Sequence, residues 1–427
     1  MKYLILSLFI FGATLALGQS PADIRASARP VIDTLCSPEL GGRGYLADGH
    51  IRAANWIAGR LARAGVVPAA PDGSYIQPFS FSLHNIKASA LTAGNQPLRS
   101  GYDYIPHSTS GAGKLKGRVA DMGHGLAPGP QVRGKIALIR AGWPPEIANN
   151  TEARNSYQKL AQVQARIEAL LPYQPAAVLI LQEKLTASFS QEAFPIPVLE
   201  VRTDAWPAGT RIAALSVTAA TEEIRSQNVM GLVQGAVSPD TVVVISAHYD
   251  HLGRMGGAFF PGANDNASGT AMLLDLAAWY ADPKHQPRYS LLFITFGAEE
   301  AGLIGSQYYV LEQPAVPLSR TRCILNLDLM GNGGDGIMAV GGVEHTALYQ
   351  RLTACNDSLQ AVPLVKARAN APNSDHYFFL RAGVPGLFIY TMGGPKHYHD
   401  VHDTPANLEL LRYGEIQTLL RALLDGL

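Results

Sequence analysis

The chain has 427 residues, of which 16% are charged, and its 34 basic and 34 acidic side chains give a formal charge of zero at pH 7. A chain of this length predicts two or three domains of the usual ~100 to 200 residues each. The balanced charge, with no basic run, speaks against nucleic-acid binding as the function.

The first 18 residues have the composition of a secretory signal peptide. Lys2 precedes an apolar run, and the small residues Ala16 and Gly18 precede Gln19. The apolar run is shorter than the ~20 residues that a membrane-spanning helix needs. We therefore expect cleavage after Gly18, export to the periplasm or the medium, and a mature protein without a membrane span.

Three cysteines, Cys36, Cys323 and Cys355, occur in the sequence. They allow at most one intramolecular disulfide, which export would permit. Their spacing is not that of a zinc site, and free thiols are the simpler interpretation for at least two of them.

The pattern of the chain changes near residues 82 and 221. Before this block, apolar residues at helical spacing predict a helix over residues 50–64. Within it, short β-like runs with Gly and Pro turns surround a polar helix expected at about residues 157–170. We expect residues 82–221 to form an inserted β-rich domain, and residues 19–81 and 222–427 to form the main domain together.

Strands and helices alternate after residue 222, which favours an α/β fold with a mostly parallel mixed sheet and helices on both faces. Apolar runs at residues 241–247, 291–296, 323–327 and 386–390 predict four buried strands. A helix is expected over residues 271–280, ending before Asp282-Pro283.

Ionisable residues follow each of these four strands. The carboxyl ends of parallel strands meet at one edge of a sheet, where ligands bind. We therefore expect one site built from the residues at this edge: His248 and Asp250, Glu299 and Glu300, Asp328, and the histidines His397, His399 and His402.

Imidazoles and carboxylates together suit a borderline divalent metal such as zinc. The set exceeds the four ligands of one tetrahedral zinc, so two ions ~3.5 to 4 Å apart, sharing a bridging carboxylate, are expected. Of the pair Glu299 and Glu300, one can bind metal while the other accepts a proton. Asp250 lies on the same strand face as His248 and is placed to accept the second N–H of that imidazole.

Taken in chain order, the motifs HYDHLG, GANDNASGTA, AEEAGLIGS, NLDLMG, SDH and YHDVHDT resemble those of the co-catalytic di-zinc aminopeptidases of the bacterial leucyl aminopeptidase and aminopeptidase Y type. The segment LCSPELGGR is similar to the start of exported bacterial members, and residues 117–201 look like their protease-associated insert. The resemblance covers nearly all of the mature chain and implies the zinc exopeptidase fold.

The resemblance also implies a role for each site residue. His248 and Asp328 would bind one zinc, Glu300 and His399 the other, and Asp265 would bridge the two ions. Glu299 would be the general base, with Asp250 and Asp403 as carboxylates behind the ligands. His399 is preferred to His397 and His402 because Tyr398 precedes it and Asp403-Thr404 follow it at the family's spacing. A cis peptide bond between Asp265 and Asn266 is implied as well.

The function that the resemblance predicts is an exported zinc-dependent aminopeptidase. It would hydrolyse the N-terminal peptide bond of peptides that have a free N-terminus, with water activated between two zinc ions. The preferred N-terminal residue and the oligomeric state stay open. We expect the insert to lie beside the cleft, to restrict access to it and to bind no metal.

Three alternatives remain on the same fold. A glutaminyl cyclase shares the HYD and EE elements but works with one zinc. A carboxypeptidase needs a basic site for the substrate carboxylate, and no arginine cluster is evident at the expected rim. A catalytically dead binding module should have lost ligands or the base, whereas all six positions are present here.

Overall fold

A computed structural model describes residues 19–427, so the expected signal peptide lies outside the described residues. The helices are α1 (Pro21–Leu35), α2 (Gly49–Arg63), α3 (Pro145–Ala148), α4 (Thr151–Ser156), α5 (Val163–Leu170), α6 (Gly269–Ala281), α7 (Ile304–Leu311), α8 (Thr346–Leu359), α9 (His376–Arg381) and α10 (Tyr413–Asp425). The strands are β1 (Val67–Pro68), β2 (Ile76–Ala93), β3 (Gln96–Leu98), β4 (Tyr104–Pro106), β5 (Gly113–Asp121), β6 (Ile136–Arg140), β7 (Ala177–Gln182), β8 (Val198–Arg202), β9 (Ile212–Val233), β10 (Ser238–His248), β11 (Gly253–Met255), β12 (Ala258–Phe260), β13 (Tyr289–Phe296), β14 (Thr321–Leu327), β15 (Gly336–Val340), β16 (Val365–Arg368) and β17 (Gly386–Met392).

The main sheet has the order β16-β15-β17-β14-β10-β13-β9. β10, β13, β14 and β17 run parallel to one another. β9 pairs antiparallel with β13, and β15 pairs antiparallel with β17. The four expected strands are therefore present, and the expected mostly parallel mixed sheet is confirmed. Because the four parallel strands end at the same edge, the loops that follow them also meet there.

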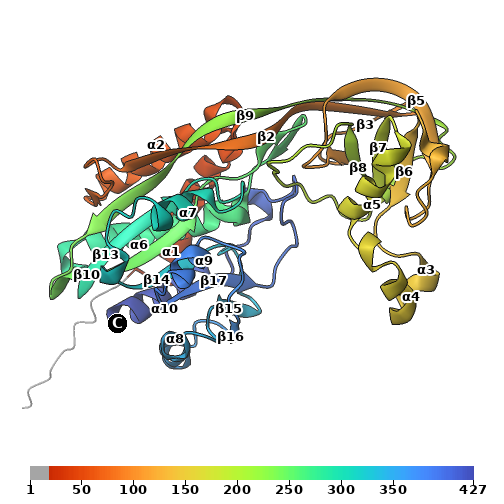
Figure 1. Cartoon of the computed structure of the whole chain (residues 1–427). Coiled ribbons are helices and arrows are strands. Elements are labelled where there is room, and N and C mark those ends of the chain that lie inside the picture. Colours follow the sequence, from red (N-terminus) through yellow and green to blue (C-terminus); the bar gives the residue numbers. More distant parts are fainter. Residues whose placement is uncertain (1–18) are drawn as a thin grey trace, which may run out of the picture.

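Helices cover both faces of this sheet (Figure 1). Val243 and Ile245 of β10 pack with apolar side chains of α1, α2, α6 and α10. The alternate residues Val242 and Val244 face the other side, where Tyr309 of α7 and Phe379 of α9 lie. Burial on both faces explains the continuous apolar run in the sequence of β10.

Two long strands, β2 and β9, connect the main sheet to the inserted region (Figure 1). They pair antiparallel from Ile76 opposite Val229 to Ala93 opposite Ala213. The expected domain boundary falls inside this ribbon, where Ser82 lies opposite Glu223. Beyond it the sheet continues in the order β9-β5-β6-β7-β8-β4. The chain thus passes from one region to the other along continuous strands.

The inserted region has a hydrophobic core of its own, which includes Ile139, Ile167 and Val178. The helix expected at about residues 157–170 is shorter than predicted, because a 3-10 turn occupies Gln158–Leu160 and α5 begins only at Val163. The guanidinium group of Arg166 donates hydrogen bonds to the carbonyl oxygens of Leu160, at 2.7 Å, and Ala161, at 3.4 Å. These bonds occupy carbonyls that a continuous helix would use.

All three cysteines are free, so no disulfide forms among them. Within residues 19–427, no helix combines the length and the apolar character that a membrane span requires.

Candidate active site

Four segments that follow parallel strands bring the expected residues together. His248 is the last residue of β10, and Asp328 comes directly after β14. Glu299 and Glu300 follow β13, and His399 lies in the loop after β17. Asp265, from the loop between β12 and α6, lies between the two histidines and completes a buried cluster.

The first half of the cluster surrounds His248, whose side chain is 2% exposed. Its Nε2 lies 3.3 Å from Oδ1 of Asp265 and 3.4 Å from Oδ1 of Asp328. Its Nδ1 lies 3.2 Å from the backbone oxygen of Asp250. A carbonyl oxygen only accepts, so Nδ1 carries the hydrogen and Nε2 faces the two carboxylates.

The second half surrounds His399 in the same way. Its Nε2 lies 3.1 Å from Oδ2 of Asp265 and 3.0 Å from Oε2 of Glu300. Its Nδ1 donates to the backbone oxygen of Ala187, at 2.8 Å. His397 and His402 lie outside the cluster, where His397 pairs with Asp400 and the ring of His402 contacts that of Tyr102.

These groups fit divalent cations. Nε2 of His399 and Oδ1 of Asp328 are buried and have no hydrogen-bond partner. Asp265 turns one carboxylate oxygen toward each histidine, so it is placed to bridge two ions. Buried carboxylates that face one another are costly unless positive charge lies between them. The ligand atoms of His248, Asp265 and Glu300 lie within 4.8 Å of one another, as do those of His248, Glu299 and Asp328.

The pKa shifts show the same demand for positive charge. Burial lowers the pKa of His399, but the carboxylates of Glu300 and Asp265 outweigh it and raise that pKa to about 11. Burial also lowers the pKa of His248, yet the carboxylates of Glu299 and Asp328 raise this pKa well above its ordinary value. A cluster that holds a proton this strongly also attracts a metal ion, which displaces the proton from the imidazole.

The two glutamates lie in different electrostatic environments. Burial raises the pKa of Glu299 well above its usual range, and the neighbouring carboxylates raise it further. Burial also raises the pKa of Glu300, but His399 and His251 together outweigh this effect and lower the pKa to about 2. Two adjacent carboxyl groups with such different proton affinities are suited to different roles.

The carboxylate of Asp250 contacts the glutamate pair more closely than it contacts His248. Its carboxylate accepts hydrogen bonds from the backbone N–H groups of Glu299 and Glu300, both at 3.2 Å. It also accepts the hydroxyl hydrogen of Tyr45, at 2.6 Å. Its Oδ1 lies 3.8 Å from Nδ1 of His248, which bonds to the Asp250 backbone oxygen instead. The structure thus differs from the expected carboxylate–imidazole pair, because the turn at Glu299 takes up both carboxylate oxygens.

The loop that carries Asp265 is fixed from two sides. The peptide bond between Asp265 and Asn266 is cis, as the resemblance implies. The carboxylate of Asp403 accepts the N–H groups of Asn264, at 2.8 Å, and Asp265, at 3.0 Å. Arg43, fully buried, donates to the backbone oxygens of Pro261, Gly262 and Asp265 in this loop, and to those of Leu35 and Tyr249.

Sequence reasoning did not single out several residues of this region. Arg43 and Tyr45 lie in a glycine-rich turn, whose only signal was its likeness to the family's N-terminal segment. His251 lies in the HYDHLG motif, and its Nδ1 is 2.7 Å from Oε1 of Glu300. No pattern in the sequence pointed to Ala187.

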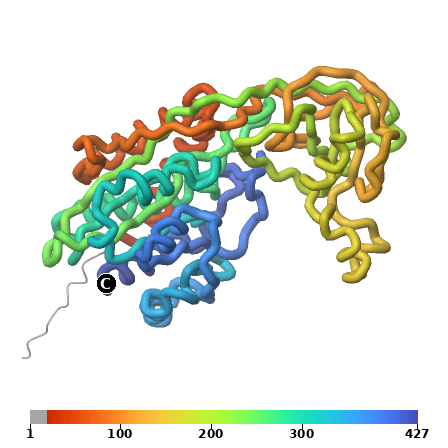
Figure 2. The backbone as a smooth tube through the Cα atoms, viewed as in Figure 1, coloured from red at the N-terminus to blue at the C-terminus, as the bar shows by residue number. Residues whose placement is uncertain are grey.

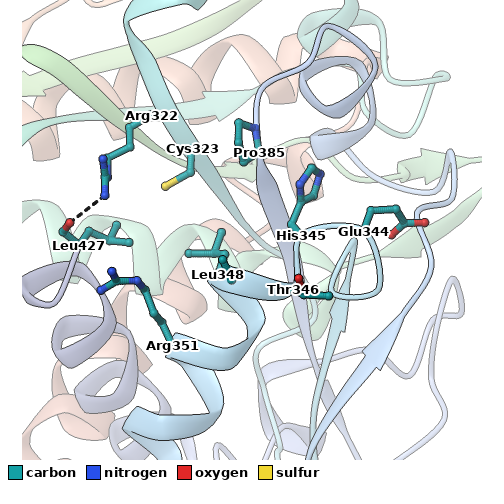
Figure 3. A pocket seen from close by; sticks show the side chains of 10 residues that line it. Arg322, Cys323, Glu344, His345, Thr346, Leu348, Arg351, Pro385 and Leu427 are labelled. Carbon is teal, nitrogen blue, oxygen red and sulfur yellow. Dashed lines mark hydrogen bonds between the residues drawn. The ribbon is translucent and has the colours of Figure 1, made fainter.

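A cavity of about 230 Å³ opens beside the cluster. It is lined by His248, Asp265, Glu299, Asp328, Leu329, Arg368, Asn373, Phe388, Tyr390 and Tyr398. A cavity of about 380 Å³ lies at the opposite end of the sheet, near the amino ends of β14 and β17, with Arg322, Cys323 and Arg351 in its lining (Figure 3). It holds none of the clustered residues, so the smaller cavity is the candidate substrate site.

The buried histidines and carboxylates at the edge of the sheet form a candidate metal centre. Residues 228–424 match the family model described as Peptidase family M28.

Curated relatives and a solved structure are similar to parts or to the whole of this chain. Aminopeptidase YwaD of Bacillus subtilis is 34% identical over 205 residues, which cover 47% of this chain and 40% of that protein. An aminopeptidase of Pseudomonas aeruginosa is 25% identical over 325 residues, which cover 71% of this chain and 57% of that protein. The chain therefore spans less than two thirds of the length of these relatives. A zinc aminopeptidase from Bacillus subtilis has the same fold over 93% of both chains, with 21% identity and a TM-score of 0.71.

Proposed function

We propose that the chain is an exported aminopeptidase that binds two zinc ions and removes the N-terminal residue of peptides with a free amino terminus. The observation that carries the proposal is the pair of imidazole Nε2 atoms, each facing one oxygen of Asp265 and one further carboxylate. The aminopeptidase names of the relatives support the choice of reaction.

In this proposal His248 and Asp328 would hold one zinc ion, Glu300 and His399 would hold the other, and Asp265 would contribute to both. When bound, the two ions would supply Lewis acidity and lower the pKa of a water molecule.

Proton transfer and binding of the substrate N-terminus would be carried out by side chains of the protein. Glu299 lines the cavity, and its raised proton affinity suits it to accept a proton and return it to the leaving amine. The carboxylate-rich wall of the cavity attracts the ammonium group of a free peptide N-terminus. Asp250 holds the backbone at Glu299 and keeps this carboxyl beside the cluster.

One observation favours a second candidate. Arg368, at the end of β16, lines the cavity together with Glu299, although no arginine cluster was expected there. A guanidinium group in the substrate cavity would suit a substrate carboxylate, as in a carboxypeptidase. A single exposed arginine can equally bind the free carboxylate of a dipeptide or an acidic side chain.

Matched substrates distinguish these reactions. We expect the purified protein to hydrolyse aminoacyl-nitroanilides and free peptides, and to leave N-acetylated peptides intact. Hydrolysis of N-acetylated peptides from the carboxyl end, prevented by C-terminal amidation, would establish the carboxypeptidase instead. Formation of pyroglutamyl products from N-terminal glutamine, without peptide hydrolysis, would indicate a cyclase.

Export is tested separately. We expect the protein isolated from outside the cytoplasm of the producing cell to begin at Gln19. An intact Met1 in that fraction would contradict cleavage of a signal peptide.

A further inference from the structure

The hydrogen-bond partner of His399 lies in the inserted region. Ala187 lies between β7 and β8, two strands of the insert's own sheet, and is 212 positions away from His399 in the sequence. Its backbone oxygen accepts the Nδ1 hydrogen of His399 at 2.8 Å, and its backbone N–H donates to the backbone oxygen of His399 at 3.0 Å. One residue of the insert therefore contacts both the imidazole and the backbone of this histidine.

The carbonyl of Ala187 determines how the imidazole can act. Because a carbonyl oxygen only accepts, Nδ1 keeps its hydrogen, and Nε2 is the nitrogen left to face Asp265 and Glu300. The same bond fixes the rotation of the ring. Partners of this kind set the tautomer and orientation of a metal-binding histidine. His399 itself lies in a loop and has a φ of 56°, so its own segment is not a regular strand or helix.

Several contacts hold this part of the insert in place. We call residues 183–190 the clamp loop. The ammonium group of Lys184 donates to the backbone oxygens of Lys396, at 2.9 Å, and Tyr398, at 3.1 Å. Leu185 and Ala187 are buried in the same apolar cluster as Val401.

The far end of the clamp loop is fixed as well. The ring of Phe189 lies 5.1 Å from that of Tyr45, whose hydroxyl group bonds to Asp250. The backbone oxygen of Ser190 accepts the N–H of His84, at 3.0 Å. The tube in Figure 2 shows the chain near residue 400 approaching the insert.

We propose that the clamp loop positions His399 for the second zinc ion, so that the insert supports one half of the metal site. This inference rests on the proposed two-zinc function. It goes beyond the expectation that the insert binds no metal, because the insert supplies no ligand and yet supplies the acceptor that orients a metal-binding histidine.

Zinc binding tests the role of the clamp loop without an activity assay. Residues 184–190 are replaced by a Gly-Ser linker of equal length, and the two zinc dissociation constants are measured by competition with a chelating dye. We expect the second constant to rise at least ~10-fold, as for loss of a partner behind a metal-binding histidine. The first should stay unchanged, because His248 bonds within its own segment.

The variant His399→Ala provides the matched background. It retains the His248 half of the site, so the linker should leave its remaining zinc constant unchanged. Equal weakening in both backgrounds would mean a general loss of folding and would overturn the positioning role. As a second readout, we expect the linker replacement to change the visible spectrum of the cobalt(II)-substituted wild-type chain. The same replacement should leave the spectrum of the cobalt(II)-substituted His399→Ala variant unchanged.

If the linker variant does not fold, Lys184→Met decides the question, because this lysine is exposed. We expect its second zinc constant to rise about three- to tenfold, because the two hydrogen bonds that Lys184 donates are lost and each contributes little net free energy at an exposed site. Lys184→Arg should restore the constant, and Lys159→Met, at an exposed lysine elsewhere in the insert, should leave it unchanged. An unchanged second constant in Lys184→Met overturns the inference. A wild-type chain that binds a single zinc overturns the two-zinc proposal as well.

Discussion

The two histidines of the cluster face the same aspartate but are held by different parts of the molecule. His248 ends a buried strand of the main sheet, and its Nδ1 bonds to the backbone two residues further on. His399 lies in an irregular loop, and its Nδ1 bonds to the insert. One half of the site is therefore supported within the main sheet, whereas the other half is supported by a contact with the insert.

The two histidines are alike in the groups that face Nε2 and differ in the groups that hold Nδ1. Both imidazoles present Nε2 to two carboxylate oxygens at 3.0 to 3.4 Å. The residue that accepts the Nδ1 hydrogen is two positions away in the sequence for His248 and 212 positions away for His399. Changes in shared residues should affect both halves, and changes in the supports should affect one.

The largest effect is expected at Asp265, which the two halves share. Asp265→Ala should remove both bridging oxygens, abolish binding of two zinc ions and lower kcat/KM by at least ~10⁴, beyond the loss of a proton-transfer group alone. Metal analysis and nitroanilide hydrolysis measure these effects. Asp240→Ala, at an aspartate whose side chain is 94% exposed, is the control and should change neither. Retention of two tight zinc ions by Asp265→Ala would show that it is no bridge.

The glutamate pair should divide between metal binding and proton transfer. Glu299→Gln keeps the size of the side chain, so both zinc ions should remain while kcat falls by ~10² to 10⁴. Glu300→Gln should weaken zinc binding in the His399 half of the site and leave the His248 half occupied. Of these two histidines, it is His399 that Glu300 contacts. Loss of zinc from Glu299→Gln, or a nearly normal rate, would reverse the assignment.

Arg43 should affect both halves through the shared loop. Arg43→Met removes the donors to five buried backbone oxygens, three of them in the segment that carries Asp265. Each buried acceptor left unpaired costs about 1 to 3 kcal/mol, so the free energy of unfolding should fall by at least about 3 kcal/mol. Urea denaturation of the protein without added zinc measures this change.

Arg52→Met is the matched control for Arg43. Arg52 also donates to backbone oxygens but is exposed, so its loss should cost less than about 1 kcal/mol. Equal effects of the two variants would show that the buried hydrogen bonds of Arg43 do not stabilise the loop.

The smallest effect is expected at Tyr45, which lies between the insert and the glutamate turn. Tyr45→Phe removes the hydroxyl group that bonds to Asp250 and keeps the ring that packs against Phe189. A bond to a charged group contributes about 1.5 to 3 kcal/mol, and partial compensation by the two backbone donors leaves about a tenfold loss of kcat. Tyr349→Phe, at a hydroxyl that bonds to Val365 away from the site, should have no effect on kcat. Zinc loss from Tyr45→Phe would place the contribution of Tyr45 at the metal site itself.

The sequence predicted the main sheet well because its strands are apolar and continuous. The runs that became β10, β13, β14 and β17 also located the residues that the structure brings to one edge. The ribbon of β2 and β9 was not predicted, although Phe79, Phe81 and Leu83 alternate with Ser80 and Ser82 in the pattern of a strand with one buried face.

The supports of the site were harder to foresee than its ionisable residues. Tyr45 and Asp250 are 205 positions apart, and Ala187 and His399 are 212 positions apart. Ala187 acts through its backbone oxygen, which every residue has, so its identity carries no signal. Contacts of this kind depend on how the insert docks, which local sequence patterns do not encode.

Diffraction data collected on both sides of the zinc absorption edge would test the central claim most directly, because the anomalous difference map locates zinc atoms independently of any model. The account predicts two peaks, one between His248, Asp265 and Asp328 and the other between Asp265, Glu300 and His399. A single peak from crystals grown with excess zinc, with Nε2 of His399 free of metal, would contradict it.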